Sequence, residues 1–145
     1  MTHPIGLAAF TVLELAPPDM VSCAAEAGFA SIGLRLLPAT AEEVQHAIVG
    51  DTPLARETAR RIADTGLPVL DIEIFRLKPD TIVAVYRAAL ETGARFGARE
   101  VLLRAVPPQI PLSIECPMHT LAATMPALER ARAMLAKTRK LLETL

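Results

Sequence analysis

The sequence contains few aromatic and cysteine side chains. Among its 145 residues there are no Trp, one Tyr, four Phe and two Cys. Because 52% of the residues are hydrophobic, the core must be built mainly from aliphatic side chains. Cys23 and Cys116 stand far apart and fit no metal-ligand spacing, so we expect two free thiols in a reducing cytoplasm.

An excess of charge of either sign is also missing. The formal net charge is −1, which argues against strong electrostatic attraction to nucleic acid or to an acidic membrane. No apolar run approaches the roughly 18 residues that a membrane helix needs, and the first residues lack the pattern of a signal peptide. We therefore expect a single-domain cytoplasmic protein without nucleic-acid or membrane partners.

Two common catalytic and nucleotide-binding motifs are absent. The glycines stand singly, so no glycine-rich loop is available to hold a nucleotide phosphate. No G-x-S-x-G motif is present to form a nucleophile elbow. A site must therefore be sought among the charged residues.

One pattern does recur: a short apolar run that ends in a charged residue. It occurs at residues 32–35, 70–73, 101–104 and 112–115. The first three runs each follow a glycine of the kind that ends a helix. Four strands that end in Arg or Glu predict a row of charges along one rim of a sheet.

Strands and helices alternate through the first two thirds of the chain. We expect strands at 5–12, 31–36, 67–75 and 100–104, and helices at 17–28, 53–66 and 82–94. Residues 41–47 are compatible with one turn of helix. Pro17-Pro18-Asp19 and Asp51-Thr52-Pro53 are typical helix starts, and Asp80-Thr81 is a candidate cap. This β-α-β-α-β-α-β order predicts a parallel sheet with right-handed crossovers.

The last third departs from this alternation. Only seven residues, three of them proline, separate the runs at 101–104 and 112–115. A parallel crossover usually takes about a dozen residues or more. We therefore expect the strand at 112–115 to be detached from the sheet: turned antiparallel, extended along the rim, or paired with a partner chain. A long helix at 126–142 closes the chain.

Several stretches resemble a known family. They are IGLAAFTVLELAPPDMVSCAAEAGFASIGLRL, GDTPLARETARRIADTGLPVLDIEIFRL, ALETGARFGAREVLL, IPLSIECP and ERARAMLAKTRKLL. These stretches resemble the sugar phosphate isomerase/epimerase family, the xylose isomerase-like (β/α)8 or TIM barrels. The resemblance implies an α/β fold, a partial barrel in which the first four strands are joined directly to the last strand and helix. Residues 1–104 would form the β/α half-barrel and residues 105–145 the C-terminal strand and helix.

The resemblance also implies a metal site and an activity. Complete barrels of this kind have about 250 residues. In the family a Glu, an Asp, a His and a second Glu hold a divalent metal, and only the second Glu has a counterpart here, Glu115. The implied activity is a proton-transferring isomerase on a sugar or related polyol or keto compound, dependent on Mn²⁺ or Mg²⁺. The alternative is a non-catalytic shortened paralogue that binds a small anion or a partner protein.

Glu73 is the second candidate catalytic residue beside Glu115. Alternation places Asp71 and Glu73 on the same side of a strand, and paired carboxylates can divide acid and base roles. Equally, Glu73 can form an ion pair with Arg35 or Arg104 on neighbouring strands. The two arginines are also candidates to bind a substrate phosphate or carboxylate, because the guanidinium group suits these oxyanions.

The segment after Glu115 supplies one further candidate. His119 follows Glu115 by four residues and is a candidate substrate-binding residue. Cys116 is better explained as a small buried residue than as a nucleophile. A half-barrel also leaves apolar surface and sheet edges uncovered, so we expect a homodimer. Exchange of the segment 112–145 between its chains is one arrangement that remains open.

Overall fold

Strands and helices alternate in the computed structural model, which describes residues 3–40, 42–75, 83–103, 113–114 and 123–142. The elements in chain order are β1 (Gly6–Leu7), η1 (Ala9–Val12), α1 (Pro17–Ala27), β2 (Ser31–Arg35), α2 (Pro53–Thr65), β3 (Val69–Phe75), η2 (Val83–Tyr86), α3 (Arg87–Arg95), β4 (Glu100–Leu103), β5 (Ser113–Ile114) and α5 (Ala127–Leu142). The expected alternation is therefore confirmed.

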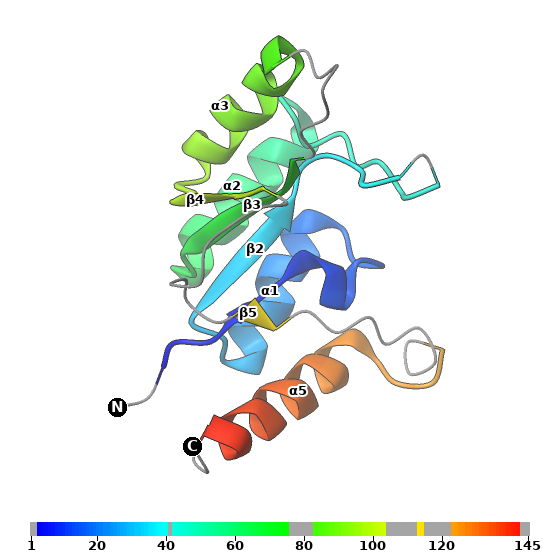
Figure 1. The fold of residues 1–145 in the computed structure, drawn as a ribbon, viewed down its shortest axis with the longest axis vertical. Helices are drawn as coiled ribbons and strands as arrows, with labels where there is room; N and C mark the ends of the chain where they lie inside the picture. The colour runs from blue at the N-terminus through cyan, green and yellow to red at the C-terminus, as the bar shows by residue number, and fades with distance from the viewer. Residues whose placement is uncertain (1–2, 41, 76–82, 104–112, 115–122, 143–145) are drawn as a thin grey trace.

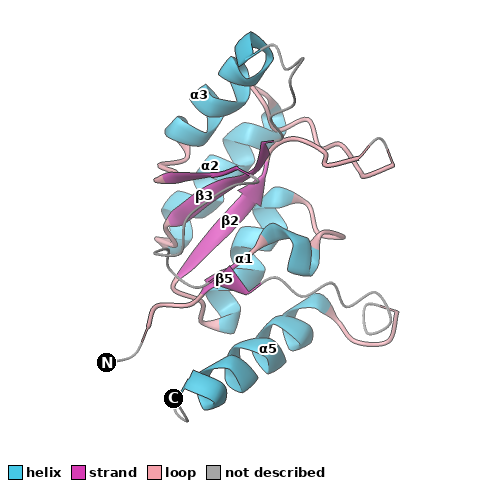
Figure 2. Ribbon diagram, viewed as in Figure 1, coloured by secondary structure: helices cyan, strands magenta, loops and turns pink. Residues whose placement is uncertain are grey.

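The strands form one parallel sheet in the order β4-β3-β2-β1-β5. Because β1 to β4 lie side by side in chain order, right-handed crossovers place their connecting helices on the same face. Figure 2 shows α1 and α2 behind the strands in this view. The opposite face is the concave side of a partial barrel.

The place of β5 corrects the expected detached strand. β5 pairs in parallel with β1, with Gly6 opposite Ser113 and Leu7 opposite Ile114. The usual crossover length applies to neighbouring strands, whereas β5 lies at the opposite edge from β4. Nine residues separate Leu103 from Ser113, and the ten Cα–Cα steps reach roughly 33 Å when extended, farther than the roughly 19 Å across four strand spacings. This edge is where the resemblance places the last strand of a barrel.

The first strand is also shorter than expected. Residues 5–12 were predicted as one strand, but β1 ends at Leu7 and a 3-10 helix, η1, follows at Ala9–Val12. Its side chains still enter the core, because Ala9, Thr11 and Val12 are buried. The turn at η1 aims the Ala9 amide at a carboxylate of β3, as described below. The predicted helical turn at 41–47 is wrong for residues 42–47, which contain no helix.

The predicted helix ends agree well with the structure. α1 begins at Pro17 and α2 at Pro53, where the Thr52 hydroxyl accepts a hydrogen bond of 3.0 Å from the Ala55 amide. Gly66 closes α2 in the left-handed conformation, at φ 65°. The helix predicted at 82–94 appears as η2 followed by α3, and its proposed cap, Asp80-Thr81, lies outside the described residues.

The last helix packs on the first. α5 lies beside α1 and also contacts η1, so it extends the helical layer at the β5 end of the molecule (Figure 1). Ala131 and Leu135 of α5 are buried there. Arg130 is buried as well. It donates a hydrogen bond of 2.6 Å to the Met125 carbonyl and forms an ion pair with Glu14.

Of the two expected reasons for association, the sheet edges are present, since β4 and β5 each pair on one side within the described residues. Exposed apolar surface is not seen in the described strands. The large hydrophobic side chains that are exposed among the described residues are Val44 and Leu90, and neither lies in a strand. No described helix is long and apolar enough to cross a membrane. The homodimer and the exchange of segment 112–145 stay predictions.

The core is mainly aliphatic, as predicted, although Phe29, Phe75 and Phe96 also belong to it, and it includes one very close approach. A Cβ atom on Gly93 of α3 would lie 3.0 Å from Cγ2 of Ile72 on β3, and still closer to its Cδ1. Ile72 is buried, so it has little room to move. Gly93 therefore sets how closely α3 approaches the sheet.

We predict that Gly93→Ala destabilises the protein by about 1–3 kcal/mol through overpacking. The loss should occur although Ala favours a helix by about 1 kcal/mol over Gly. Adding Ile72→Val, which removes Cδ1, should recover part of the loss. Urea unfolding of both single variants and the double variant measures the coupling, and additive effects would contradict the prediction.

Candidate functional site

Charged side chains from β2 and β3 meet at the carboxyl end of the sheet. Arg35 is the last residue of β2 and lies opposite Glu73 in the parallel register. Its Nη2 atom donates to Glu73 Oε2 at 3.4 Å. The predicted ion pair of Glu73 with an arginine of a neighbouring strand is thus confirmed for Arg35.

A backbone amide is the second partner of Glu73. The Ala9 amide in η1 donates to Glu73 Oε1 at 2.9 Å. Glu73 is only 1% exposed, so its carboxylate depends on such donors rather than on water. The short β1 and the turn at η1 are what bring this amide over the strand ends.

Arg35 has a second carboxylate partner, Glu43. Both carboxylate oxygens of Glu43 lie 3.1 Å from Arg35 Nη1, and the Ala39 amide donates to Glu43 Oε2 at 2.7 Å. The Phe10 ring packs on the guanidinium group, with Cζ 5.3 Å from the ring centroid. The side chains of Arg35 and Glu43 are 7% and 17% exposed. Arg35 is therefore nearly enclosed by two carboxylates and an aromatic ring.

One donor of Arg35 is left over. Its Nε atom is buried and makes no hydrogen bond with the described residues. A cavity of about 10 Å³ lies beside Arg35, lined also by Leu13, Met20 and His46. A space of this size holds about one water molecule. Neither Glu43 nor Glu73 lines this cavity, which is too small for a larger ligand.

Gly33 leaves room for the two carboxylates of β3. A Cβ atom at Gly33 would lie 2.5 Å from Asp71 Oδ1 and 3.5 Å from Glu73 Oε1. Asp71 and Glu73 therefore lie on the same face of the sheet, as strand alternation predicts. Any larger residue at position 33 would press on this pair.

The described residues do not supply a metal site. Among them there is no group of three or more His, Cys, Asp or Glu side chains that could hold a metal ion. Glu73 already accepts hydrogen bonds from Arg35 and Ala9. The other predicted site residues, Glu115, Arg104 and His119, lie outside the described residues, so their roles stay predictions.

The described cysteine has no features of a reactive nucleophile. Cys23 is a buried free thiol, and burial raises its pKa. The carboxylates of Glu26 and Glu14 raise the pKa further, while Arg130 and Arg132 act in the opposite direction. A thiol of this kind stays protonated near neutral pH and reacts slowly. Cys116 lies outside the described residues.

Sequence reasoning missed three of the groups that surround the Arg35–Glu73 pair: Glu43, Phe10 and the Ala9 amide. Glu43 lies between β2 and α2, in a stretch without helical or strand periodicity, so no pattern marked it. Phe10 and Ala9 were assigned to a strand that ends earlier than expected. The charge of Glu43 was the sole available signal, and charge alone does not select a partner.

We predict that Glu73→Gln lowers the free energy of unfolding by about 1–3 kcal/mol, because a buried charged hydrogen bond to Arg35 is weakened. The matched control is Glu57→Gln in α2. Glu57 also binds two arginines, and hydrogen bonds from Arg60 and then Arg61 lower its pKa, but this pair lies at the surface. Its loss should change stability little. Equal effects in urea unfolding would contradict this view of Glu73.

Comparisons with known proteins identify the fold. No family model matches the sequence, and a search of curated proteins finds no match. Solved structures do match. One is a xylose isomerase domain containing protein from Salmonella typhimurium LT2, at TM-score 0.54 and 12% identity, covering 91% of this chain and 48% of that one.

A second solved structure is a xylose isomerase-like TIM barrel/4-hydroxyphenylpyruvate dioxygenase fusion protein. It aligns at TM-score 0.50 and 17% identity, over 71% of this chain and 16% of the other. The chain thus spans less than half the length of either protein. At these identities the likeness concerns the fold alone. The chain has the fold of the xylose isomerase-like TIM barrels, in the form of a partial barrel.

Proposed function

We propose that this chain binds a small ligand carrying a carboxylate or phosphate group, with Arg35 as the binding residue. The observation that carries the proposal is a buried guanidinium group at the carboxyl end of a parallel strand, with its Nε atom unused by the described residues. Ligands of parallel α/β sheets bind at this end. A guanidinium group also matches the geometry of carboxylate and phosphate oxygens.

The likeness to xylose isomerase-like barrels supports a sugar-like ligand. A sugar phosphate, or a related polyol or keto compound with an acidic group, combines that class with the charge of Arg35. In this proposal Glu73 orients the Arg35 side chain through their ion pair. Arg104 and His119 are further candidates for ligand contacts.

A second proposal is the metal-dependent isomerase/epimerase implied by the resemblance. The observation that favours it is the pair of carboxylates, Asp71 and Glu73, that share one face over Gly33. Glu73 would serve as general base and Glu115 as a ligand of Mn²⁺ or Mg²⁺. Since the described residues do not fit a metal site, this activity depends on Glu115 and on residues that are not described or belong to another segment or chain.

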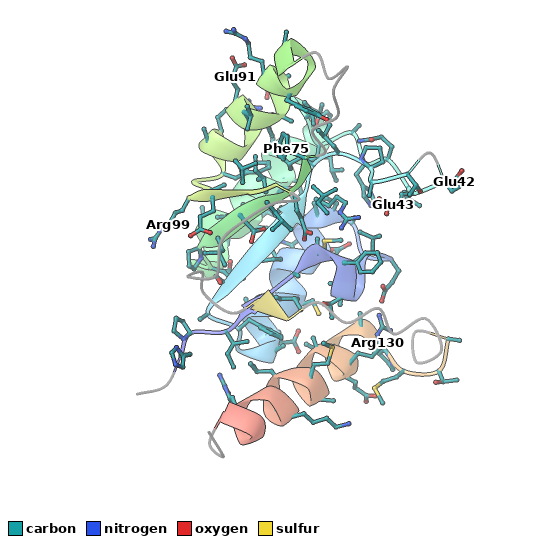
Figure 3. The ribbon with its side chains drawn as sticks, in the orientation of Figure 1. Glu42, Glu43, Phe75, Glu91, Arg99 and Arg130 are labelled. Atoms are coloured by element: carbon teal, nitrogen blue, oxygen red, sulfur yellow. The ribbon has the colours of Figure 1, made fainter. Side chains whose placement is uncertain are left out.

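We predict that Arg35→Met weakens binding of ribose 5-phosphate by about tenfold or more, because a charged hydrogen-bond donor is lost. Isothermal titration calorimetry measures the dissociation constant. Arg35→Lys keeps the positive charge but not the forked guanidinium group, so its affinity should lie between those of the wild type and Arg35→Met. Arg99→Met is the matched control, since Arg99 is exposed and precedes β4, on the opposite side of the sheet from Glu43 (Figure 3).

Equal losses in Arg35→Met and Arg99→Met would show that only net charge matters and would refute the Arg35 site. Circular dichroism should first establish that each variant is folded. If Arg35→Met does not fold, Arg35→Lys carries the test, because it keeps the two carboxylates paired with a cation. Unchanged affinity in a folded Arg35→Lys variant would count against recognition by the guanidinium fork.

The isomerase proposal makes a separate prediction for metal binding. It predicts that Mn²⁺ binds the wild type with micromolar affinity and that Glu115→Gln abolishes this binding, because a carboxylate ligand is removed. Calorimetric titration of both proteins measures it. The absence of binding in both would reject the metal-dependent isomerase while leaving ligand binding at Arg35 intact.

A further inference from the structure

Glu43 fills the position at Arg35 where a ligand's acidic group would bind. We propose that Glu43 is an internal competitor, which a carboxylate or phosphate group must displace in order to reach Arg35. This inference rests on the proposed binding function of Arg35 and adds how access to that site is controlled.

The contact geometry supports a competitor. Both oxygens of Glu43 approach the same nitrogen, Arg35 Nη1, at 3.1 Å. A bound carboxylate or phosphate would also place its oxygens at the guanidinium N–H groups, most favourably as two parallel hydrogen bonds from two nitrogens. Glu43 therefore shows directly that this face of Arg35 accepts an oxyanion.

The occupied donors require displacement. Both oxygens of Glu43 lie at Arg35 Nη1, and Glu73 Oε2 accepts from Nη2. The nearby cavity of about 10 Å³ is lined by neither carboxylate and offers no alternative place for a phosphate group. An oxyanion that binds Nη1 must therefore replace Glu43.

The charges of the cluster lead to the same conclusion. Arg35, Glu43 and Glu73 carry together one net negative charge. Adding an anion while Glu43 stays would raise this to two in a poorly hydrated place, which is unfavourable. Exchange of Glu43 for the anion leaves the net charge the same when the ligand carries a single charge.

Of the two carboxylates, Glu43 is the one positioned to leave. Glu73 lies within β3, is 1% exposed and is bonded to the Ala9 amide. Glu43 lies outside helices and strands, on the segment that extends beyond the sheet (Figure 3). Its side chain is 17% exposed, and within the described part of the chain it contacts Arg35 and the Ala39 amide. Its release breaks no element of the sheet.

The test compares phosphate and acetate binding in three proteins: the wild type, Glu43→Gln and Glu42→Gln. Glu42 is the matched control, because it is the exposed neighbour of Glu43 and loses the same charge. We expect Glu43→Gln to bind inorganic phosphate about tenfold more tightly than the wild type, since the competing charged hydrogen bond is weakened. Glu42→Gln should stay near the wild type. Comparing the two anions shows whether the site prefers phosphate or carboxylate.

A second measurement uses the unmodified protein. In ¹H–¹⁵N NMR spectra, phosphate should shift the Ala39 amide signal, because its hydrogen bond to Glu43 is lost on displacement. The Ala9 amide signal should change less, because its bond to Glu73 remains. This measurement keeps the proposal testable even if Glu43→Gln is poorly folded.

The outcomes separate this inference from the proposed function. Equal phosphate affinity in Glu43→Gln, Glu42→Gln and wild type, together with a loss in Arg35→Met, would refute the competitor while Arg35 remains the binding residue. Phosphate binding that persists in Glu43→Gln/Arg35→Met would refute both. No phosphate or acetate binding by folded Glu43→Gln would also refute both.

Discussion

The buried carboxylate of Glu73 is the constraint on which the site depends. An ionised group that is 1% exposed must find donors within the protein, because water cannot reach it. The turn into η1 supplies the Ala9 amide, and the end of β2 supplies Arg35. Gly33 leaves the space above β2 empty for these side chains. The need to satisfy the Glu73 carboxylate thus accounts both for the early end of β1, which lets the Ala9 amide reach it, and for the glycine at position 33.

An ion pair of a second buried charged residue, Arg130, connects the C-terminal helix to the N-terminal part of the chain. Arg130 of α5 is 2% exposed and pairs with Glu14, just after η1. β5 meanwhile pairs with β1, so strand and helix of the C-terminal segment both meet the N-terminal part of the chain. This gives a partial barrel whose first strand is flanked on both sides. The last helix, α5, packs on α1 and continues the helical layer.

Fold and function are supported by different observations. The likeness to xylose isomerase-like barrels establishes the architecture, at identities too low to transfer an activity. The case for ligand binding comes from Arg35, whose guanidinium group is buried at the carboxyl end of a parallel sheet and is already bound to an oxyanion, that of Glu43. Because the chain spans less than half of each solved protein, binding by this segment and catalysis by a complete barrel are separate questions.

The sequence by itself determined the order of strands and helices, since apolar alternation, Thr52 and the helix-ending glycines act locally. It also predicted an ion pair of Glu73 with Arg35 or Arg104, because these residues end or nearly end adjacent strands of a parallel sheet, and the structure shows the pair with Arg35. Only the tertiary structure decided that β1 stops at Leu7, that β5 joins the far edge and that Glu43 binds Arg35. These outcomes depend on contacts between parts of the chain that are distant in sequence. Local periodicity and spacing do not indicate which distant parts come into contact.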